Sequence, residues 1–251
     1  MNSKQIKISI VSYFNTLPFR YALKHSELIH RMDLQEDMPS ICAQKLKFKQ
    51  VEIGLVPVAL LPELDAYEII TDYCIGADGK VDSEKLYSDV PLDEIKHIVL
   101  DYQSKSSITL TKVLNKFYWK KNVEYIDAKP GYEQNIKGDT AAVVIGDRTF
   151  ALNGSFRYEF DLAEEWKKFT GLPFAFAAWV ATSKVDPDFV KEFNAVLSDG
   201  VNNIRSALDE STIKHPANFD AYDYLSHKID YRLDAKKREA LNLFLEYISK
   251  L

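Results

Sequence analysis

The sequence predicts an α/β protein with two lobes, each a mixed, mostly parallel sheet flanked by helices. Three observations support this fold class. Short apolar runs alternate with amphipathic helical patterns, the alternation begins again near residue 95, and an apolar run at 171–182 returns the chain late in the sequence. We therefore assign residues 1–88 and 178–251 to lobe one and residues 89–177 to an inserted lobe two, with a ligand cleft between them.

The first unit alternates strands with helices. Helical patterns cover residues 19–25 and 41–48, and Ser40 is placed as the N-cap of the second because a serine oxygen can accept from a free first-turn N–H. Pro57 interrupts the apolar run at 51–61, which favours a buried strand ending in a turn. The expected strands are residues 6–11, 32–36, 51–57 and 67–75.

The second unit repeats this pattern before the chain crosses back. Asp186-Pro187 then supplies the N-cap and first-turn residues of a long helix, and a last helix is expected from about residue 234. A strand–helix unit inserted between two crossings is the layout of the type II periplasmic-binding-protein fold. Within the insertion, the expected strands are residues 95–100, 125–128 and 141–145, and the expected helices are residues 108–117 and 162–169.

Composition excludes several classes of function. The chain has 251 residues, and its net charge of −5 argues against a general nucleic-acid binder. Two cysteines, Cys42 and Cys74, are too few for a disulfide framework and lack metal-binding spacing. No apolar run is long enough to span a membrane, and no signal peptide is recognised, so we expect a cytoplasmic protein without membrane partners. The oligomeric state stays open.

The stretch VSYFNTLPF at 11–19 is the first candidate site. It lies where the first strand ends and the first helix begins, and ligands of open α/β sheets bind at that junction. Ser12, Asn15 and Thr16 place neutral donors and acceptors there. We expect Asn15 to contact the reacting ligand.

Four segments together resemble the chorismate dehydratases of the futalosine route to menaquinone. They are SYFNTLPF at 12–19, CIGADGKVDS at 74–83, VIGD at 144–147 and DLAEEWKKFTGLPFAFAAW at 161–179. The resemblance implies the two-lobed fold, a hydro-lyase without metal or organic cofactor, and a small dicarboxylate substrate. It also implies catalytic roles for Asn15 and Ser83, with Tyr13 beside them. No P-loop or dinucleotide fingerprint is present, which agrees with a cofactor-free reaction.

Chorismate carries two carboxylates, so its site needs groups that hold anions. Helix N-termini offer free N–H groups and a positive dipole end, and the candidates follow residues 12–16, Ser40 and residues 104–107. Ser104, Ser106 and Ser107 exceed what one cap requires, whereas Ser40 alone is interpreted chiefly as a cap. Gly146-Asp147 ends a predicted strand, and we favour a helix N-cap role for Asp147 over catalysis.

The implied reaction removes water from chorismate to leave 3-[(1-carboxyvinyl)oxy]benzoate. The ring C3 proton is vinylogous to the ring carboxylate, and the hydrogen and hydroxyl lie on one face, which favours a stepwise route. The five histidines lie away from the matched segments. We therefore hypothesise that the substrate's own enolpyruvyl carboxylate takes the proton while Asn15 and Ser83 position it.

Some positions depart from the family pattern, and two other functions remain open. Glu84-Lys85 stands where apolar residues are usual, and the other departures are Tyr102-Gln103, Ser106 and Arg148-Thr149. The first alternative is a non-catalytic cytosolic protein that binds small carboxylates, which the fold alone supports equally well. The second is the sibling lyase acting on cyclic dehypoxanthine futalosine, whose Ser-Pro-Cys-Pro-Asn-Asp-Thr opening motif and histidine have no match here.

Overall fold

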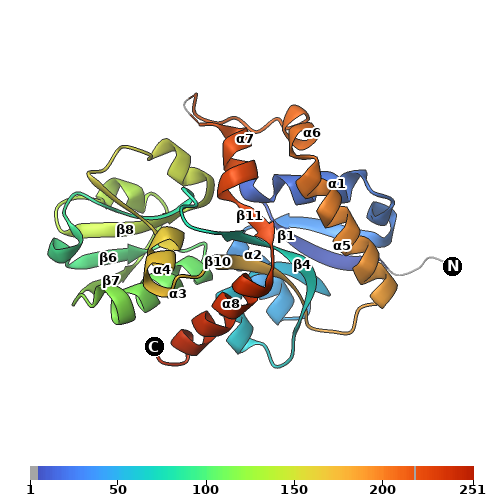
Figure 1. Ribbon diagram of the computed structural model, residues 1–251, viewed down its shortest axis with the longest axis horizontal. Coiled ribbons are helices and arrows are strands. Elements are labelled where there is room, and N and C mark those ends of the chain that lie inside the picture. Colours follow the sequence, from blue (N-terminus) through green and yellow to red (C-terminus); the bar gives the residue numbers. More distant parts are fainter. Residues whose placement is uncertain (1–4, 218) are drawn as a thin grey trace.

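The computed structural model describes residues 5–217 and 219–251 and contains two sheets, one in each lobe (Figure 1). The sheet of lobe one has the strand order β11-β4-β10-β3-β1-β2. Strands β1, β2 and β3 run parallel, and β10 and β11 are antiparallel to their neighbours. The strands are β1 (Ile6–Val11), β2 (Met32–Asp37), β3 (Ile53–Pro57), β4 (Glu68–Ala77), β10 (Phe174–Ala181) and β11 (Asp230–Arg232).

The sheet of lobe two has the order β7-β6-β8-β5-β9, with a parallel half and an antiparallel half. The two mixed sheets confirm the predicted fold class. The strands of this sheet are β5 (Glu84–Ser88), β6 (His97–Leu100), β7 (Glu124–Asp127), β8 (Thr140–Ile145) and β9 (Tyr158–Asp161).

The chain crosses between the sheets twice, at residues 78–83 and 171–173. Strand β5 pairs with β8 and β9, so residues 84–88 lie in the second sheet rather than in lobe one as expected from the sequence. Strand β10 begins at Phe174, four residues before the expected return at 178. The first crossing leaves from the end of β4 and the second enters the start of β10. Because β4 and β10 pair with each other, both crossings lie side by side at this sheet.

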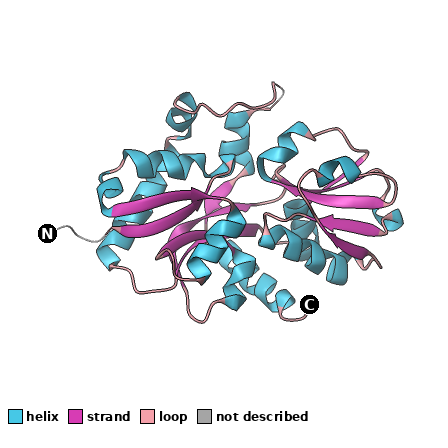
Figure 2. Cartoon of the chain, turned by 180° about the vertical axis from the view of Figure 1, so that it is seen from behind, coloured by secondary structure: helices cyan, strands magenta, loops and turns pink. Residues whose placement is uncertain are grey.

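Helices flank both sheets (Figure 2). Helices α1 and α5 pack against each other over the first sheet, and α8 packs on β10 and reaches α3. The α-helices are α1 (Leu17–His25), α2 (Pro39–Lys47), α3 (Lys105–Val113), α4 (Leu162–Thr170), α5 (Pro187–Asn202), α6 (Ile204–Asp209), α7 (Ala221–Asp223) and α8 (Ala235–Ile248). The shorter 3-10 and π elements are η1 (Phe14–Thr16), η2 (Glu27–Arg31), η3 (Val58–Glu63), η4 (Leu92–Glu94), η5 (Leu114–Trp119), η6 (Tyr132–Asn135), η7 (Gly146–Ala151) and η8 (Tyr224–Lys228).

Helix starts follow local capping chemistry, with one correction. The Asp186 side chain accepts from the N–H of Asp188 (3.0 Å), as predicted. Ser40 is not an N-cap: α2 begins at Pro39, and Met38 holds the cap position without a side-chain bond. Proline favours the first helical position because its fixed φ suits the helix and its missing N–H is not needed there. The helix therefore starts earlier, and Ser40 lies inside its first turn.

The inner strands of the first sheet are buried, as their apolar sequences require. All eight residues of β10 are buried, and so are all five of β3. Cys42 and Cys74 are buried free thiols, and burial raises the pKa of Cys42 to about 12. Among the described residues, no helix is long and apolar enough to cross a membrane.

Candidate functional site

Two turns, one from each sheet, meet in the cleft. Strand β1 runs into the turn before η1, and β8 runs directly into η7. The Asp147 carboxylate on η7 accepts from the backbone N–H of Phe14, at 3.0 and 3.3 Å to its two oxygens. The Tyr13 hydroxyl donates to the side-chain oxygen of Gln103, which follows β6. These two contacts join the lobes at the cleft in the present conformation.

Gly146 makes this close approach possible. Its φ is +65°, in the left-handed region that favours glycine, and a Cβ added there would lie 2.8 Å from the ring of Tyr13. Any larger residue would therefore push the Tyr13 ring away from η7.

A small cavity of about 30 Å³ lies between the turns. A buried water needs roughly 10–15 Å³ of such space, so the cavity has room for one or two waters and no more. A ligand the size of a substituted benzoate would therefore require the lobes to separate. The polar side chains in its lining come from both sheets and are those of Tyr13, Asn15, Glu84 and Ser104.

Three buried polar atoms beside this cavity have no hydrogen-bond partner among the described residues. They are Oδ1 of Asn15, Oγ of Ser83 and the hydroxyl of Tyr224. Burial raises the pKa of Tyr224 well above its usual range, and the nearby Ser83 and Asn15 side chains oppose that rise. The three groups therefore share one place, where Ser83 and Asn15 lie close enough to the Tyr224 hydroxyl to lower its pKa. Buried polar atoms are nearly always paired in native proteins, so this cluster has the features of a ligand site.

Glu84 brings a carboxyl group to the same cavity. Its side chain is buried, and the Ser107 hydroxyl donates a hydrogen bond to it. Burial raises the pKa of Glu84 to about 8, and the nearby carboxylates of Asp101 and Asp161 add to the effect. The group is therefore largely protonated at pH 7.

The three serines predicted at the start of α3 separate into different environments. Ser104 is the N-cap, accepting from the Ser107 N–H (3.3 Å), and it lines the cavity. The Ser107 hydroxyl contacts Ser104 (2.9 Å) and Glu84. The Ser106 hydroxyl donates to the carbonyl of Phe176 (2.7 Å) and accepts from the N–H of Ala59 (3.2 Å). It therefore ties α3 to the first lobe.

Three other predicted residues lie around the cavity without lining it. The Thr16 hydroxyl turns inward, 2.6 Å from the Val11 carbonyl and 2.8 Å from that of Tyr13, so it stabilises the turn. Ser12 is half-buried, and its N–H donates to the Asp37 carbonyl (2.9 Å). Ser40 is half-buried in the first turn of α2.

Asp147 does not cap a helix, contrary to the preferred interpretation. Element η7 begins at Gly146 with Ile145 in the cap position, so Asp147 lies inside the element. Its carboxylate instead binds the Phe14 N–H across the cleft. Burial raises the pKa of Asp147, against the effects of that N–H and of Arg20.

Arg148 acts electrostatically on Tyr13 and Glu84, but carboxylates already neutralise it. Its guanidinium pairs with the buried Asp101 and with Glu133 (2.7 Å), and it donates to Gln103 (3.2 Å). A bound anion would compete with these partners. Among the described residues, no group of three or more His, Cys, Asp or Glu side chains gathers to hold a metal ion.

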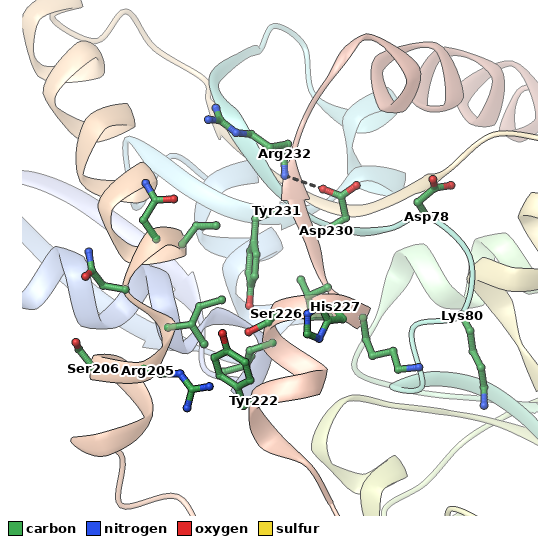
Figure 3. A pocket seen from close by; sticks show the side chains of 17 residues that line it. Asp78, Lys80, Arg205, Ser206, Tyr222, Ser226, His227, Asp230, Tyr231 and Arg232 are labelled. Atoms are coloured by element: carbon green, nitrogen blue, oxygen red, sulfur yellow. Dashed lines mark hydrogen bonds between the residues drawn. The ribbon is translucent and has the colours of Figure 1, made fainter.

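A larger groove of about 850 Å³ lies on the outer face between α5, η8 and β11 (Figure 3). Figure 3 shows Tyr231 and Ser226 at its centre, with Arg205 and Tyr222 near one end and Lys80 near the other. One hydrogen bond links this groove to the cleft cavity: the Tyr231 hydroxyl donates to the backbone carbonyl of Asn15 (2.9 Å). We place the candidate site in the smaller cleft cavity, because three of the unpaired buried groups lie beside it, whereas one, the Ser226 hydroxyl, lies in the groove.

Sequence reasoning missed Tyr224, Tyr231 and the role of Glu84. Both tyrosines lie between the two helices predicted near the C-terminus, in a stretch for which the sequence predicts no function. Glu84 was noted as a departure from a family pattern, and that departure was the available signal.

The two lobes have the fold of periplasmic binding proteins. A protein of Archaeoglobus fulgidus has a similar structure, with a TM-score of 0.79, 13% identity, and coverage of 100% of this chain and 98% of the other. The alkanesulfonate-binding protein of Xanthomonas axonopodis pv. citri, bound to MOPS, gives 0.61 at 11% identity over 98% and 94% of the two chains. A Candida albicans protein with the generic periplasmic binding protein fold gives 0.60 at 11% identity over 98% and 94%.

These likenesses show the fold alone. The sequence itself matches the model of the menaquinone biosynthesis family over residues 6–250. The chain therefore belongs to the menaquinone biosynthesis family.

Proposed function

We propose that this protein is a chorismate dehydratase, which converts chorismate to 3-[(1-carboxyvinyl)oxy]benzoate as the first step of the futalosine route to menaquinone. The observation that carries the proposal is the cluster of unpaired polar atoms of Asn15, Ser83 and Tyr224 in the cleft. Membership of the menaquinone biosynthesis family and the four matched segments support it.

The chemistry asks little of the protein. Loss of the C3 proton gives a dienolate that delocalises onto the ring carboxylate, and departure of the C4 hydroxyl then yields the aromatic ring. The protein must orient the substrate, stabilise the dienolate and hydrogen-bond the leaving hydroxyl. Asn15 and Ser83 have free hydrogen-bonding capacity for these tasks, and Tyr224 adds a third neutral group.

The proton acceptor in this proposal is the substrate's enolpyruvyl carboxylate. An intramolecular base can have an effective molarity on the order of 10⁵ M when it is well oriented. The protein's own carboxyls fit that task poorly, because Asp147 is bound to the Phe14 N–H and Glu84 is largely protonated near neutrality.

Substrate binding requires the cleft to open and close again. The closed cavity of about 30 Å³ cannot hold chorismate, so the contacts of Asp147 with Phe14 and of Tyr13 with Gln103 must break on entry. Closure around the substrate would expel water and strengthen neutral hydrogen bonds.

A second candidate is a non-catalytic protein that binds small carboxylates. The observation that favours it is the similarity to an alkanesulfonate-binding protein, a relationship of fold. Binding of chorismate without turnover would support this candidate.

The deciding experiment incubates the purified protein with chorismate and separates the products by chromatography. We expect the aromatic carboxyvinyloxybenzoate with the unaltered protein and its loss with Asn15→Ala. Neither binding nor turnover would overturn both candidates. A parallel comparison of melting temperatures with chorismate and with cyclic dehypoxanthine futalosine tests the sibling lyase reaction, since a ligand stabilises the protein that binds it.

A further inference from the structure

Glu84 has a carboxyl group whose surroundings do not suit a negative charge. The side chain is 6% exposed, lines the cleft cavity, and has the Ser107 hydroxyl as its hydrogen-bond partner. None of the ion pairs in the described part of the chain includes it. A buried carboxylate without an ion-pair partner is unfavourable and takes up a proton instead where it can.

A bound dicarboxylate would make a charged Glu84 still less favourable, because like charges would face each other in a dry cleft. A protonated Glu84 avoids this repulsion and can donate a hydrogen bond. One carboxyl oxygen accepts from Ser107, so the other can carry the proton into the cavity.

We propose that Glu84 binds the ligand as a neutral carboxylic acid that donates a hydrogen bond to one of its carboxylates. The inference rests on the proposed function in that it takes chorismate and its product as the ligands. The donor would also stabilise charge that moves onto the ring carboxylate during the reaction, as buried carboxylic acids do in other oxyanion sites.

Other groups near Glu84 titrate elsewhere or are already paired. Burial raises the pKa of Glu84 to about 8 and that of Asp161 to about 6, so the two carboxyl groups titrate in different pH ranges. Burial also raises the pKa values of both neighbouring tyrosines, which therefore stay neutral at pH 8. The charged and titratable groups that act on Glu84 from the surrounding elements are Tyr13, Asp101, Arg148, Asp161 and Tyr224.

The test measures binding of the aromatic product, which keeps both carboxylates and is not consumed. Below about pH 7 we expect a constant Kd, and above pH 8 a Kd that weakens about tenfold per pH unit, because the ligand must then bind together with a proton. Calorimetry at pH 9 in two buffers of different ionisation enthalpy should show uptake of about one proton per ligand. No uptake at pH 9 would overturn the proposal.

Variants separate a donor from other roles. Glu84→Gln keeps a neutral donor, so it should bind within about tenfold of the unaltered protein at pH 7 and lose the weakening above pH 8. Glu84→Leu has no donor and should bind at least tenfold more weakly at pH 7. The control is Glu246→Gln, a carboxyl-to-amide change on the exposed face of α8, which should leave the Kd of the product and its pH dependence unchanged.

The outcomes distinguish this inference from the proposed function. Product binding with proton uptake but no turnover of chorismate would uphold Glu84 as the donor and overturn the dehydratase. Turnover of chorismate with pH-independent binding of the product would uphold the dehydratase and overturn the donor role of Glu84. Turnover that Glu84→Gln abolishes without weakening binding would assign Glu84 as a base and overturn the donor role. Absence of product binding at every pH would overturn the donor role, and turnover of chorismate would then decide the dehydratase by itself.

Discussion

The hydroxyl of Tyr231 donates a hydrogen bond to the backbone carbonyl of Asn15, at 2.9 Å. The C-terminal segment therefore fixes the backbone of a turn that lies near the start of the chain. Tyr224, seven residues earlier, leaves its buried hydroxyl unpaired beside the side chain of the same asparagine. The two tyrosines differ in what their hydroxyls do, and phenylalanine at each position separates stability from binding.

Tyr231→Phe should destabilise the protein by about 1–3 kcal/mol, because it leaves a buried carbonyl without a partner. For a chain of this size, 1 kcal/mol lowers the melting temperature by about 2–4 °C. Tyr224→Phe should leave the melting temperature unchanged or raise it, and should weaken product binding up to about tenfold. Thermal unfolding and calorimetry measure both. Equal loss of stability in the two variants would contradict the assignment.

Gly146→Ala should impair ligand binding as well as stability. The substitution places a methyl group 2.8 Å from the Tyr13 ring and also puts alanine at a φ of +65°. Gly154→Ala is the matched control, because its φ is +76° but nothing lies within 4 Å of the added carbon. Each change costs about 1 kcal/mol or more from the left-handed backbone, and binding should fall in Gly146→Ala alone. Unaltered product affinity in Gly146→Ala would refute the contact.

Asp147→Ala should favour an open cleft, because it removes the acceptor for the Phe14 N–H. We expect a larger radius of gyration by small-angle X-ray scattering without ligand, and a return toward the closed value with product. Asp147→Asn keeps an oxygen acceptor and should resemble the unaltered protein. The same variant tests the base: loss of turnover in Asp147→Asn with binding retained would contradict the substrate's own carboxylate as proton acceptor.

Glu84 should make the stability of the protein decline as the pH rises. Its pKa is about 8 in the folded protein against an ordinary value of 4.5, so the folded state holds a proton that the unfolded chain loses. The favourable contribution is complete below about pH 4.5, is lost as the pH rises toward 8, and is constant above. Glu84→Gln cannot ionise at this position. Denaturant unfolding at pH 5, 6.5 and 8 should therefore show its free energy of unfolding rising relative to that of the unaltered protein as the pH increases. Parallel pH curves would contradict this.

The sequence predicted best the elements whose pattern is local and long. Strand β10 and helices α5 and α8 follow from an unbroken apolar run or a sustained helical stripe. Strand β5 was missed because it begins with Glu84-Lys85, which looks like an exposed turn. Both residues are buried, and Lys85 is neutralised by Glu159 (3.0 Å) far along the chain. Pairing of this kind leaves no periodic signal in the sequence.

The same limit applies to the site. Asn15 is predicted from its place where the first strand meets the first helix, and Ser83 from the resemblance. The structure places both beside Tyr224, whose position depends on how the C-terminal segment packs across the cleft. Ser106 was grouped with its serine neighbours by sequence proximity. Its hydroxyl instead bonds to Phe176 and Ala59, which only the packing of α3 against the first sheet brings near. Capping was predicted correctly at Asp186 and wrongly at Ser40 and Asp147, and contacts between lobes leave no local signal in the sequence.

The insertion of one lobe into the other also has a consequence for how the chain folds. Phe174 pairs with Ala77, so the neighbouring strands β4 and β10 of the first sheet close a loop that contains the whole second lobe. Closing a long loop has an entropic cost. An insertion that has already folded lowers this cost because it holds the two ends of the loop near each other. We therefore expect the inserted lobe to form early and the first sheet to be completed late. During synthesis, β4 would wait for β10 while the intervening segment acquires its structure.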